Sequence, residues 1–146
     1  MAVRDAAAFL RYPSAANPVA GGFERTFACG SSQSGRLLRE FVYRGLNLDE
    51  EGQQAYDGLL PHVAGGRLAE FKNRFGQPNN WGLRGWPGRG PLADNPVPDP
   101  FSGQVDGLLK RQRDLGGVPK IIHTNTSTEY WGGHGSLSHI DGSLHG

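Results

Sequence analysis

The chain has 146 residues, a length that fits one domain, and we expect residues 1–146 to form a single folded unit. A mean hydropathy of −0.51, without an apolar run of about 18 residues, excludes a membrane-spanning helix. The net charge of +1 comes from interspersed basic and acidic residues, whereas nucleic-acid-binding proteins carry a clustered basic face. The one cysteine, Cys29, excludes an internal disulfide and a multi-cysteine zinc site.

The start of the chain lacks the charged segment, apolar core and cleavage site of a secretory signal. A cytoplasmic location is therefore expected by default. The densest basic stretch, residues 110–113, is interpreted as the solvated face of a helix.

The first half of the chain is predicted to alternate between helix and strand. Residues 5–12 are typical of a helix that Pro13 stops, because proline cannot continue the backbone hydrogen bonding. A loop of small residues follows at 14–22. Residues 23–30 indicate a strand, in which threonine and phenylalanine supply β preference.

A helix is predicted over residues 34–44. Its apolar stripe consists of Leu37, Leu38, Phe41 and Val42. We expect the charged residues to face elsewhere, namely Arg36, Arg39, Glu40 and Arg44. Gly45 is well placed to end the helix, because glycine accepts the left-handed conformation that often follows a helix terminus.

The second half is predicted to return to strand and helix around an irregular insert. Residues 56–64 indicate a strand, which Pro61 assigns to a sheet edge or a strand end. Residues 104–115 indicate a helix with Val105, Leu108, Leu109 and Leu115 on one side. Residues 118–123 then indicate a buried strand.

This order of strands and helices is typical of an α/β fold, a parallel sheet covered by helices. Between Trp81 and Pro100, nine of 20 residues are Gly or Pro, which no regular element tolerates. Loops this long in a compact domain are usually functional or disordered. The aromatic residues within 65–100 favour a packed cap insert over a free linker.

The chemistry is concentrated in the turn Gly30-Ser31-Ser32-Gln33-Ser34-Gly35, between the predicted strand and helix. A serine at such a tight turn needs small residues two positions before and after it, and Gly30 and Ser34 satisfy this about Ser32. The turn would lift the Ser32 hydroxyl above the sheet edge and direct the Gln33 N–H at a developing oxyanion. The alternative is that Ser32 or Ser34 merely caps the helix. Ser34 is a weaker nucleophile candidate, because bulky Arg36 lies two positions after it.

Four blocks of the chain, in order, resemble a bacterial family of large α/β-hydrolase-domain proteins: SQSGRLLREF (32–41), DGLLPHVAG (57–65), FKNRFGQP (71–78) and PKIIHTNTSTEYW (119–131). The resemblance covers nearly the whole chain. It implies an α/β-hydrolase fold, partial in this chain, and a nucleophile serine in a Gly-x-Ser-Gln-Ser-Gly motif, at Ser32. It also implies further strands before this chain and a further strand and histidine after it, so that the chain is an internal fragment, expected to be inactive alone.

In this fold the catalytic acid follows the serine and precedes the histidine, in a loop after a late strand. Glu129 lies just after the predicted strand 118–123, where that acid would fall. The alternatives are that Glu129 is an exposed loop carboxylate or that Asp141 is the acid. The histidine is expected to lie outside this chain.

The five histidines do not indicate a metal site. His62 and His123 lie in or beside apolar strand runs, which favours hydrogen-bonded core or supporting roles. The remaining three have spacings that match no familiar zinc pattern, and they follow Glu129 too closely to supply the base: His134, His139 and His145.

These features predict a serine hydrolase of ester-type substrates that acts through an acyl-enzyme. Ser32 and Glu129 are its candidate catalytic residues, and the Gln33 N–H is its oxyanion donor. The expected partner is a small-molecule ester, with no metal, other cofactor, nucleic acid or membrane. The alternative is a non-catalytic remnant or binding fragment of the same fold. The sequence does not indicate the substrate, the oligomeric state or the compartment.

Overall fold

The computed structural model describes residues 2–19, 22–66, 93–98 and 103–138. Its elements in chain order are α1 (Ala2–Arg11), β1 (Phe27–Ser31), α2 (Gln33–Tyr43), β2 (Gly58–His62), β3 (Val97–Pro98), β4 (Val105–Asp106), α3 (Lys110–Leu115), β5 (Lys120–Ile121), α4 (Ser127–Trp131) and a short 3₁₀ helix (Gly135–Ser138). The predicted order of strand, helix, strand, helix and strand is confirmed. None of the described helices is long and apolar enough to cross a membrane.

The centre of the fold is a parallel three-stranded sheet with the order β1-β2-β5. Ala28, Leu59 and Ile121 are neighbours across the sheet, and all three pack into the core. Helix α2 supplies the apolar side chains that cover them, and two leucines before α3 complete the cluster: Leu38, Phe41, Val42, Leu108 and Leu109. This arrangement is the α/β architecture expected from the sequence, with helices packed on a parallel sheet.

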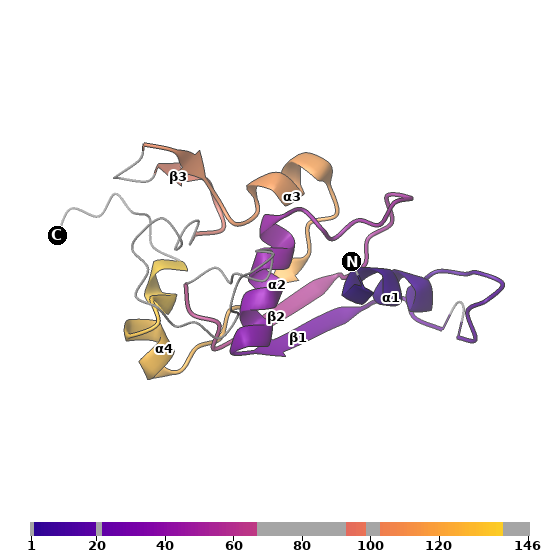
Figure 1. The fold of residues 1–146 in the computed structure, drawn as a ribbon, viewed down its shortest axis with the longest axis horizontal. Coiled ribbons are helices and arrows are strands. Elements are labelled where there is room, and N and C mark those ends of the chain that lie inside the picture. Colours follow the sequence, from indigo (N-terminus) through magenta and orange to yellow (C-terminus); the bar gives the residue numbers. More distant parts are fainter. Residues whose placement is uncertain (1, 20–21, 67–92, 99–102, 139–146) are drawn as a thin grey trace, which may run out of the picture.

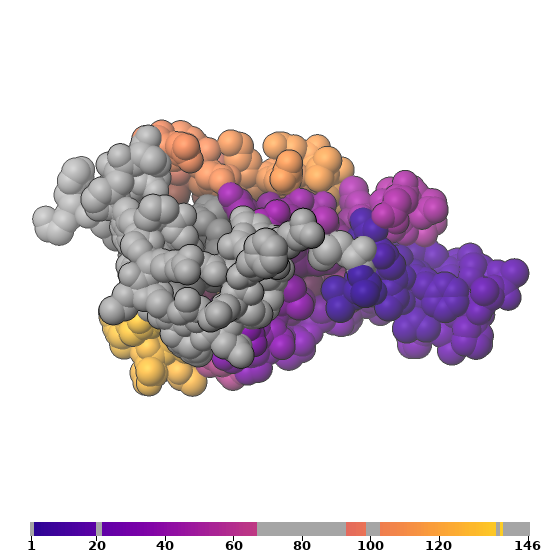
Figure 2. Space-filling model, in the orientation of Figure 1, coloured from indigo at the N-terminus to yellow at the C-terminus, as the bar shows by residue number. Residues whose placement is uncertain are grey.

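The two ends of the sheet have different surroundings. The carboxyl ends of β1 and β2 point towards α4, whereas α1 lies near their amino ends (Figure 1). In the space-filling view, α1 and the loop that follows it form a lobe at one end of the molecule (Figure 2). The carboxyl edge of the sheet is therefore the place where the turn after β1 and the helix after β5 come near each other.

Strand β2 lies at the centre of the sheet, so the prediction that Pro61 marks a sheet edge is wrong. The alternative of a strand end is confirmed, because Pro61 is the fourth of five residues in β2. Proline has no N–H for the ladder. The hydrogen-bonded pairing between β2 and β5 accordingly stops at Ile121. Beyond Pro61, a single parallel bridge joins His62 and Thr124.

Helix α2 is buried around more of its circumference than its apolar stripe predicted. Arg39 and Glu40 are 1% and 3% exposed, so the expectation that they face away from the core is wrong. Glu40 forms an ion pair with Arg44 one turn later, at 2.6 Å between Oε1 and Nε. Burial lowers the pKa of Arg39 to about 10, although the nearby charge of Asp94 opposes this effect. Gly45 follows the helix with φ +69°, as predicted.

The predicted helix over 104–115 is present only in its second half, as α3. Its first half contains β4, which pairs antiparallel with β3. The cause is a close backbone approach, since a Cβ on Gly107 would lie 2.6 Å from the Asn95 carbonyl carbon. As a result Leu108 and Leu109 are buried, whereas Val105 and Leu115, predicted to share their face, are exposed.

All three predicted strands are shorter in the structure, and of the predicted strand 56–64 only Gly58–His62 forms β2. The segment 118–123 forms only β5, and Ile122 is 64% exposed, so the expectation of a buried strand is wrong there. In the segment 23–30, β1 begins only at Phe27. The preceding residue, Thr26, accepts a hydrogen bond from the Asp57 N–H at the amino edge of the sheet.

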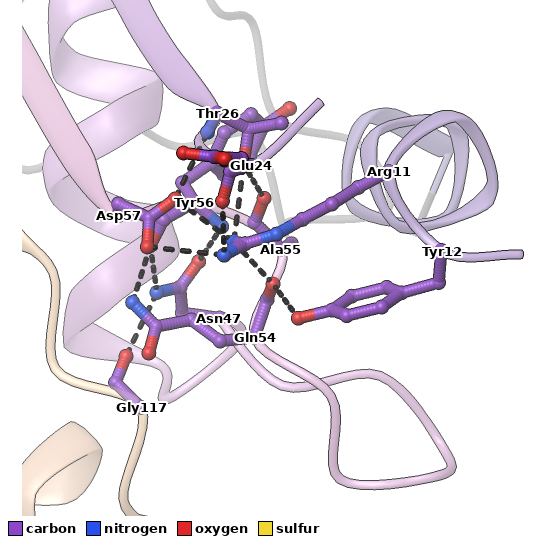
Figure 3. Close-up of polar contacts among 10 residues, drawn as sticks. All are labelled: Arg11, Tyr12, Glu24, Thr26, Asn47, Gln54, Ala55, Tyr56, Asp57 and Gly117. Atoms are coloured by element: carbon purple, nitrogen blue, oxygen red, sulfur yellow. Dashed lines mark hydrogen bonds and ion pairs between the residues drawn. The ribbon is translucent and has the colours of Figure 1, made fainter. Parts of the chain in front are cut away.

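The three basic residues of the stretch 110–113 are exposed, as predicted, whereas Gln112 between them is fully buried in α3. The Gln112 side chain accepts a hydrogen bond from the Asn47 N–H at 3.0 Å. Asn47 is also fully buried and donates from Nδ2 to the carbonyl oxygens of Tyr56 and Gly117, each at 2.8 Å (Figure 3). One asparagine thereby ties the segments that lead into β2 and β5 to the loop after α2.

The predicted cap insert, residues 65–100, lies largely outside the described residues. Its described carboxyl-terminal part, residues 93–98, contains β3, so the expectation that no regular element occurs in the insert is wrong there. The cap itself stays a prediction.

Arg11 of α1 reaches across to Asp57 at the amino edge of the sheet (Figure 3). The closest separation between the two groups is 2.9 Å, from Arg11 Nη1 to Asp57 Oδ2, and the Thr26 N–H donates to the same oxygen at 2.9 Å. Burial raises the pKa of Asp57, but the bonds from Thr26 and Arg11 outweigh it, so that the pKa lies below its usual value. Both side chains are largely buried, so breaking the pair is expected to be costly.

We expect Asp57→Asn to lower the free energy of unfolding at neutral pH by about 1–3 kcal/mol, because buried donors lose a charged acceptor. Folding lowers the pKa of Asp57, so this group stabilises the fold above its ordinary pKa of about 4. That stabilisation disappears as the pH falls through the lowered pKa. Urea unfolding at several pH values should therefore give a flatter acid limb for Asp57→Asn than for the unaltered protein.

Glu51→Gln is the matched control for this prediction, because Glu51 is an exposed acid in the loop before β2. It should leave both the neutral-pH stability and the acid limb unchanged. Equal stability of Asp57→Asn and Glu51→Gln at neutral pH would contradict a stabilising role for the Arg11–Asp57 pair.

Candidate functional site

Three chain segments meet at the carboxyl edge of the parallel sheet, where ligands of open α/β sheets bind. Backbone hydrogen bonds join the turn after β1 to the end of β2, from the Ser32 N–H to the His62 carbonyl oxygen at 2.9 Å. A bond of 2.7 Å then joins the Val63 N–H to the Thr124 carbonyl oxygen after β5. The three segments are thus fixed relative to one another by main-chain contacts.

Ser32 occupies the single position between β1 and α2, with φ 55° and ψ −117°. Residues other than glycine rarely adopt this conformation, and each such residue costs on the order of 1–3 kcal/mol. The surrounding bonds hold it, because the Ser32 N–H donates to His62 and its carbonyl oxygen accepts from the Arg36 N–H at 3.0 Å. A strained serine is therefore held in the turn by the ends of three elements.

Two glycines allow β1 and α2 to approach this closely. A Cβ on Gly30 would lie 2.5 Å from the Ser34 carbonyl oxygen. A Cβ on Gly35 would lie 2.9 Å from the carbonyl oxygens of both Gly30 and His62. The prediction that residue 30 must be small agrees with this crowding. On the helix side, the prediction named Ser34, but Ser34 is exposed and the crowded position is Gly35.

The Ser32 side chain is exposed and makes no capping hydrogen bond to α2. This geometry does not support the alternative that Ser32 is only a helix cap. Gln33 begins α2, and the first N–H groups of a helix point out of its N-terminal end, where negative charge is favoured. Ser34 lies inside the first turn of the helix and is also exposed.

Glu129 lies in the short helix α4, directly after β5, and not in an exposed loop. Thr126 caps this helix, and its Oγ1 accepts a hydrogen bond from the Glu129 N–H at 3.3 Å. The Glu129 side chain is partly buried, and its Oε2 lies over Gly65 and Gly133. Since Gly65 follows β2, the carboxylate lies at the same edge of the sheet as Ser32. The competing acid, Asp141, lies outside the described residues.

Of the three described histidines, His62 and His123 have partners other than Glu129, and His134 lies after α4 with φ 64°. His62 is exposed, which corrects the expectation of a core position, and its Nδ1 lies 2.9 Å from Thr124 Oγ1. His123 Nε2 lies 3.4 Å from Asp94 Oδ1. Within the described ranges, no hydrogen bond joins a histidine to the Glu129 carboxylate. His139 and His145 lie outside them.

Sequence reasoning missed the charged group formed by Asp94, His123 and Arg39. The hydrogen bond from His123, followed by its charge and that of Arg39, lowers the pKa of Asp94 against the opposing effect of burial. Asp94 also accepts, through its backbone carbonyl, the Leu109 N–H at 3.2 Å. No pattern in the sequence linked these three residues, because they lie on α2, before β3 and after β5.

In the described part of the chain, no group of three or more His, Cys, Asp or Glu side chains is arranged to hold a metal ion. The features at the carboxyl edge are instead a strained, exposed serine after the first strand and a carboxylate after the last. A parallel sheet, a covering helix and a serine at the strand-to-helix turn define an α/β protein whose candidate site lies at the carboxyl edge.

Comparison with protein families identifies the family of α/β proteins to which the chain belongs. A family model described as an alpha/beta hydrolase domain matches residues 2–141. Because the match covers almost the whole chain, this protein belongs to that α/β-hydrolase family. Comparisons with curated proteins and with solved structures gave no match.

Proposed function

We propose that this α/β-hydrolase domain acts on ester-type substrates through an acyl-enzyme formed on Ser32. The observation that carries the proposal is the backbone of Ser32, held at φ 55° between β1 and α2 with an exposed side chain. Strained residues that the surrounding structure holds in place cluster at active sites. Family membership supports the hydrolase class.

Ser32 would attack the carbonyl carbon of the ester and form a tetrahedral intermediate. The Gln33 N–H, at the start of α2, would donate to its oxyanion. The N-terminal end of an 11-residue helix favours the negative charge that develops there. Collapse of the intermediate would release the alcohol, and water would then hydrolyse the acyl-serine.

Glu129 would orient the histidine that takes the proton from Ser32. Its place after β5, at the edge of the sheet that also carries Ser32, supports this role. His62 and His123 bond to Thr124 and Asp94, and His134 follows Glu129 by only five residues. We therefore propose that the base is a histidine outside the described residues.

The proposal also includes a substrate pocket, a class of substrate and a cellular location. Part of the insert 65–100 would form a cap over the carboxyl edge and shape the pocket for the acyl or alcohol group. The partner is a small-molecule ester, with no cofactor, and a cytoplasmic location belongs to the same proposal.

Fluorophosphonate labelling tests the proposal, because these probes react with serines that an adjacent base activates. In the full-length protein, the probe should label Ser32 and mass spectrometry should find the adduct there. Ser34→Ala is the matched control, since Ser34 is a second exposed serine two residues away. It should reduce labelling only partly.

The alternative, a non-catalytic remnant of the fold, makes the opposite prediction. A folded protein that shows no labelling at Ser32 and no hydrolysis of p-nitrophenyl acetate would favour a binding role. Labelling that moves to Ser34 would mean that the nucleophile is misassigned.

A further inference from the structure

The Glu129 carboxylate lies against two glycines that come from different parts of the chain. Gly65 follows β2 and Gly133 follows α4. A Cβ on Gly65 would lie 2.8 Å from Glu129 Oε2, and a Cβ on Gly133 would overlap with the same oxygen. Neither position can carry a side chain while the carboxylate keeps its place.

The two glycines belong to one bonded surface. The Gly66 N–H donates to the Gly133 carbonyl oxygen at 2.9 Å, and the Gly133 N–H donates to the Glu129 carbonyl oxygen at 3.0 Å. The segment after β2 is thereby joined to the residues that follow α4. The carboxylate lies over this junction, with its Oε2 beside both Gly65 and Gly133.

We infer that Gly65 and Gly133 are positioning residues that fix the Glu129 carboxylate at the carboxyl edge of the sheet. This inference rests on the proposed function, in which that carboxylate orients the catalytic histidine. Because Gly65 and Gly133 have no side chains, they leave space for the carboxylate in this orientation. The backbone hydrogen bonds of Gly66 and Gly133 keep the two segments beside it in place. A displacement of about 1 Å at a catalytic group can lower turnover by about 100-fold.

Gly133→Ala is the sharper of the two possible tests. Gly65 has φ +61°, and a Cβ there would also lie 2.6 Å from the Gly133 carbonyl oxygen, so its substitution would strain the fold itself. Gly133 does not have a positive φ of that kind. Its new methyl group would meet the end of a flexible side chain, the Glu129 carboxylate, and is expected to displace it.

We expect Gly133→Ala to lower kcat by about 100-fold and to leave KM nearly unchanged, because the acid acts on the base and not on substrate binding. In a Glu129→Gln background the same substitution should cause little further loss, since the carboxylate is already absent.

Gly132→Ala is the matched control. A Cβ on Gly132 would lie 2.9 Å from the Thr128 carbonyl oxygen, the same crowding that Gly133 meets at the Glu129 carbonyl oxygen. Apart from its two chain neighbours, no other atom of the described residues would lie within 4 Å. It therefore reproduces the strain at the end of α4 without touching the carboxylate, and kcat should stay close to that of the unaltered protein. Equal losses in the two variants would overturn the inference.

A measurement that does not depend on turnover separates this inference from the proposed function. The carboxyl-carbon NMR signal of Glu129 should shift in Gly133→Ala and not in Gly132→Ala. If the signal shifts but Glu129→Gln retains full activity, the glycines position the carboxylate and the proposed acid role is wrong. If the signal does not shift, the glycines do not position Glu129, whatever the protein catalyses.

Discussion

Ser32→Ala should lower turnover by about 10⁶-fold, the scale of losing a triad nucleophile. Fluorophosphonate labelling should disappear in the same variant. The fold should be unaffected, because the Ser32 side chain makes no capping hydrogen bond and lies exposed. The measurement is steady-state hydrolysis of p-nitrophenyl acetate by the full-length protein, together with urea unfolding of each variant. Labelling that survives the substitution would rule out Ser32 as the nucleophile.

Ser32→Gly is a second control, which tests whether the backbone at Ser32 is strained. Glycine accepts φ 55° without a Cβ penalty, so this variant is expected to be more stable than Ser32→Ala by roughly 1 kcal/mol while equally inactive. A gain in stability together with a loss of turnover would indicate that the strained turn is kept for catalysis. Equal stability of the two variants would contradict the strain itself.

Glu129→Gln should lower turnover by about 10⁴-fold, the effect of neutralising a triad acid. The amide keeps the size of the side chain but cannot stabilise the positive charge that the histidine acquires. No hydrogen bond to the Glu129 carboxylate holds the described part of the fold together, so the unfolding free energy should change little. The measurement is kcat together with the urea midpoint.

Asp141→Asn is the comparison for this prediction, because Asp141 is the competing acid. It should keep turnover near that of the unaltered protein. A loss of less than tenfold in Glu129→Gln, together with inactivation in Asp141→Asn, would mean that the acid is misassigned.

The strand-to-helix turn at Ser32 could be predicted because its determinants are local. Phenylalanine and threonine before Gly30 favour a strand, and the apolar period after Ser34 favours a helix. Such a junction leaves few residues for the turn, and small residues are needed wherever two backbones approach. Whether Ser32 is the nucleophile stays a prediction, as does the acid role of Glu129.

The position of β2 and the split of the segment 104–115 could not be predicted, because both depend on residues distant in sequence. Pro61 is usually a sign of a sheet edge, yet β2 is central, because β5 pairs with it before the missing N–H and Thr124 pairs with it after. The apolar residues of 104–115 fit a helix, but Gly107 lies against Asn95 and the first half pairs with β3. A tertiary contact overrode local preference in each case.

The sequence by itself determined the class of fold, the alternation of the three parallel strands with α2 and α3, and the tight turn that contains Ser32, since these depend on period, turn chemistry and neighbouring residues. Only the tertiary structure decided that Arg39 and Glu40 are buried, that Asp94 pairs with His123, and that Gly65 and Gly133 surround the Glu129 carboxylate. The physical reason is that burial and contact are properties of surfaces that meet after folding. A helical period indicates one apolar face, but it does not tell how many other segments will pack around that helix.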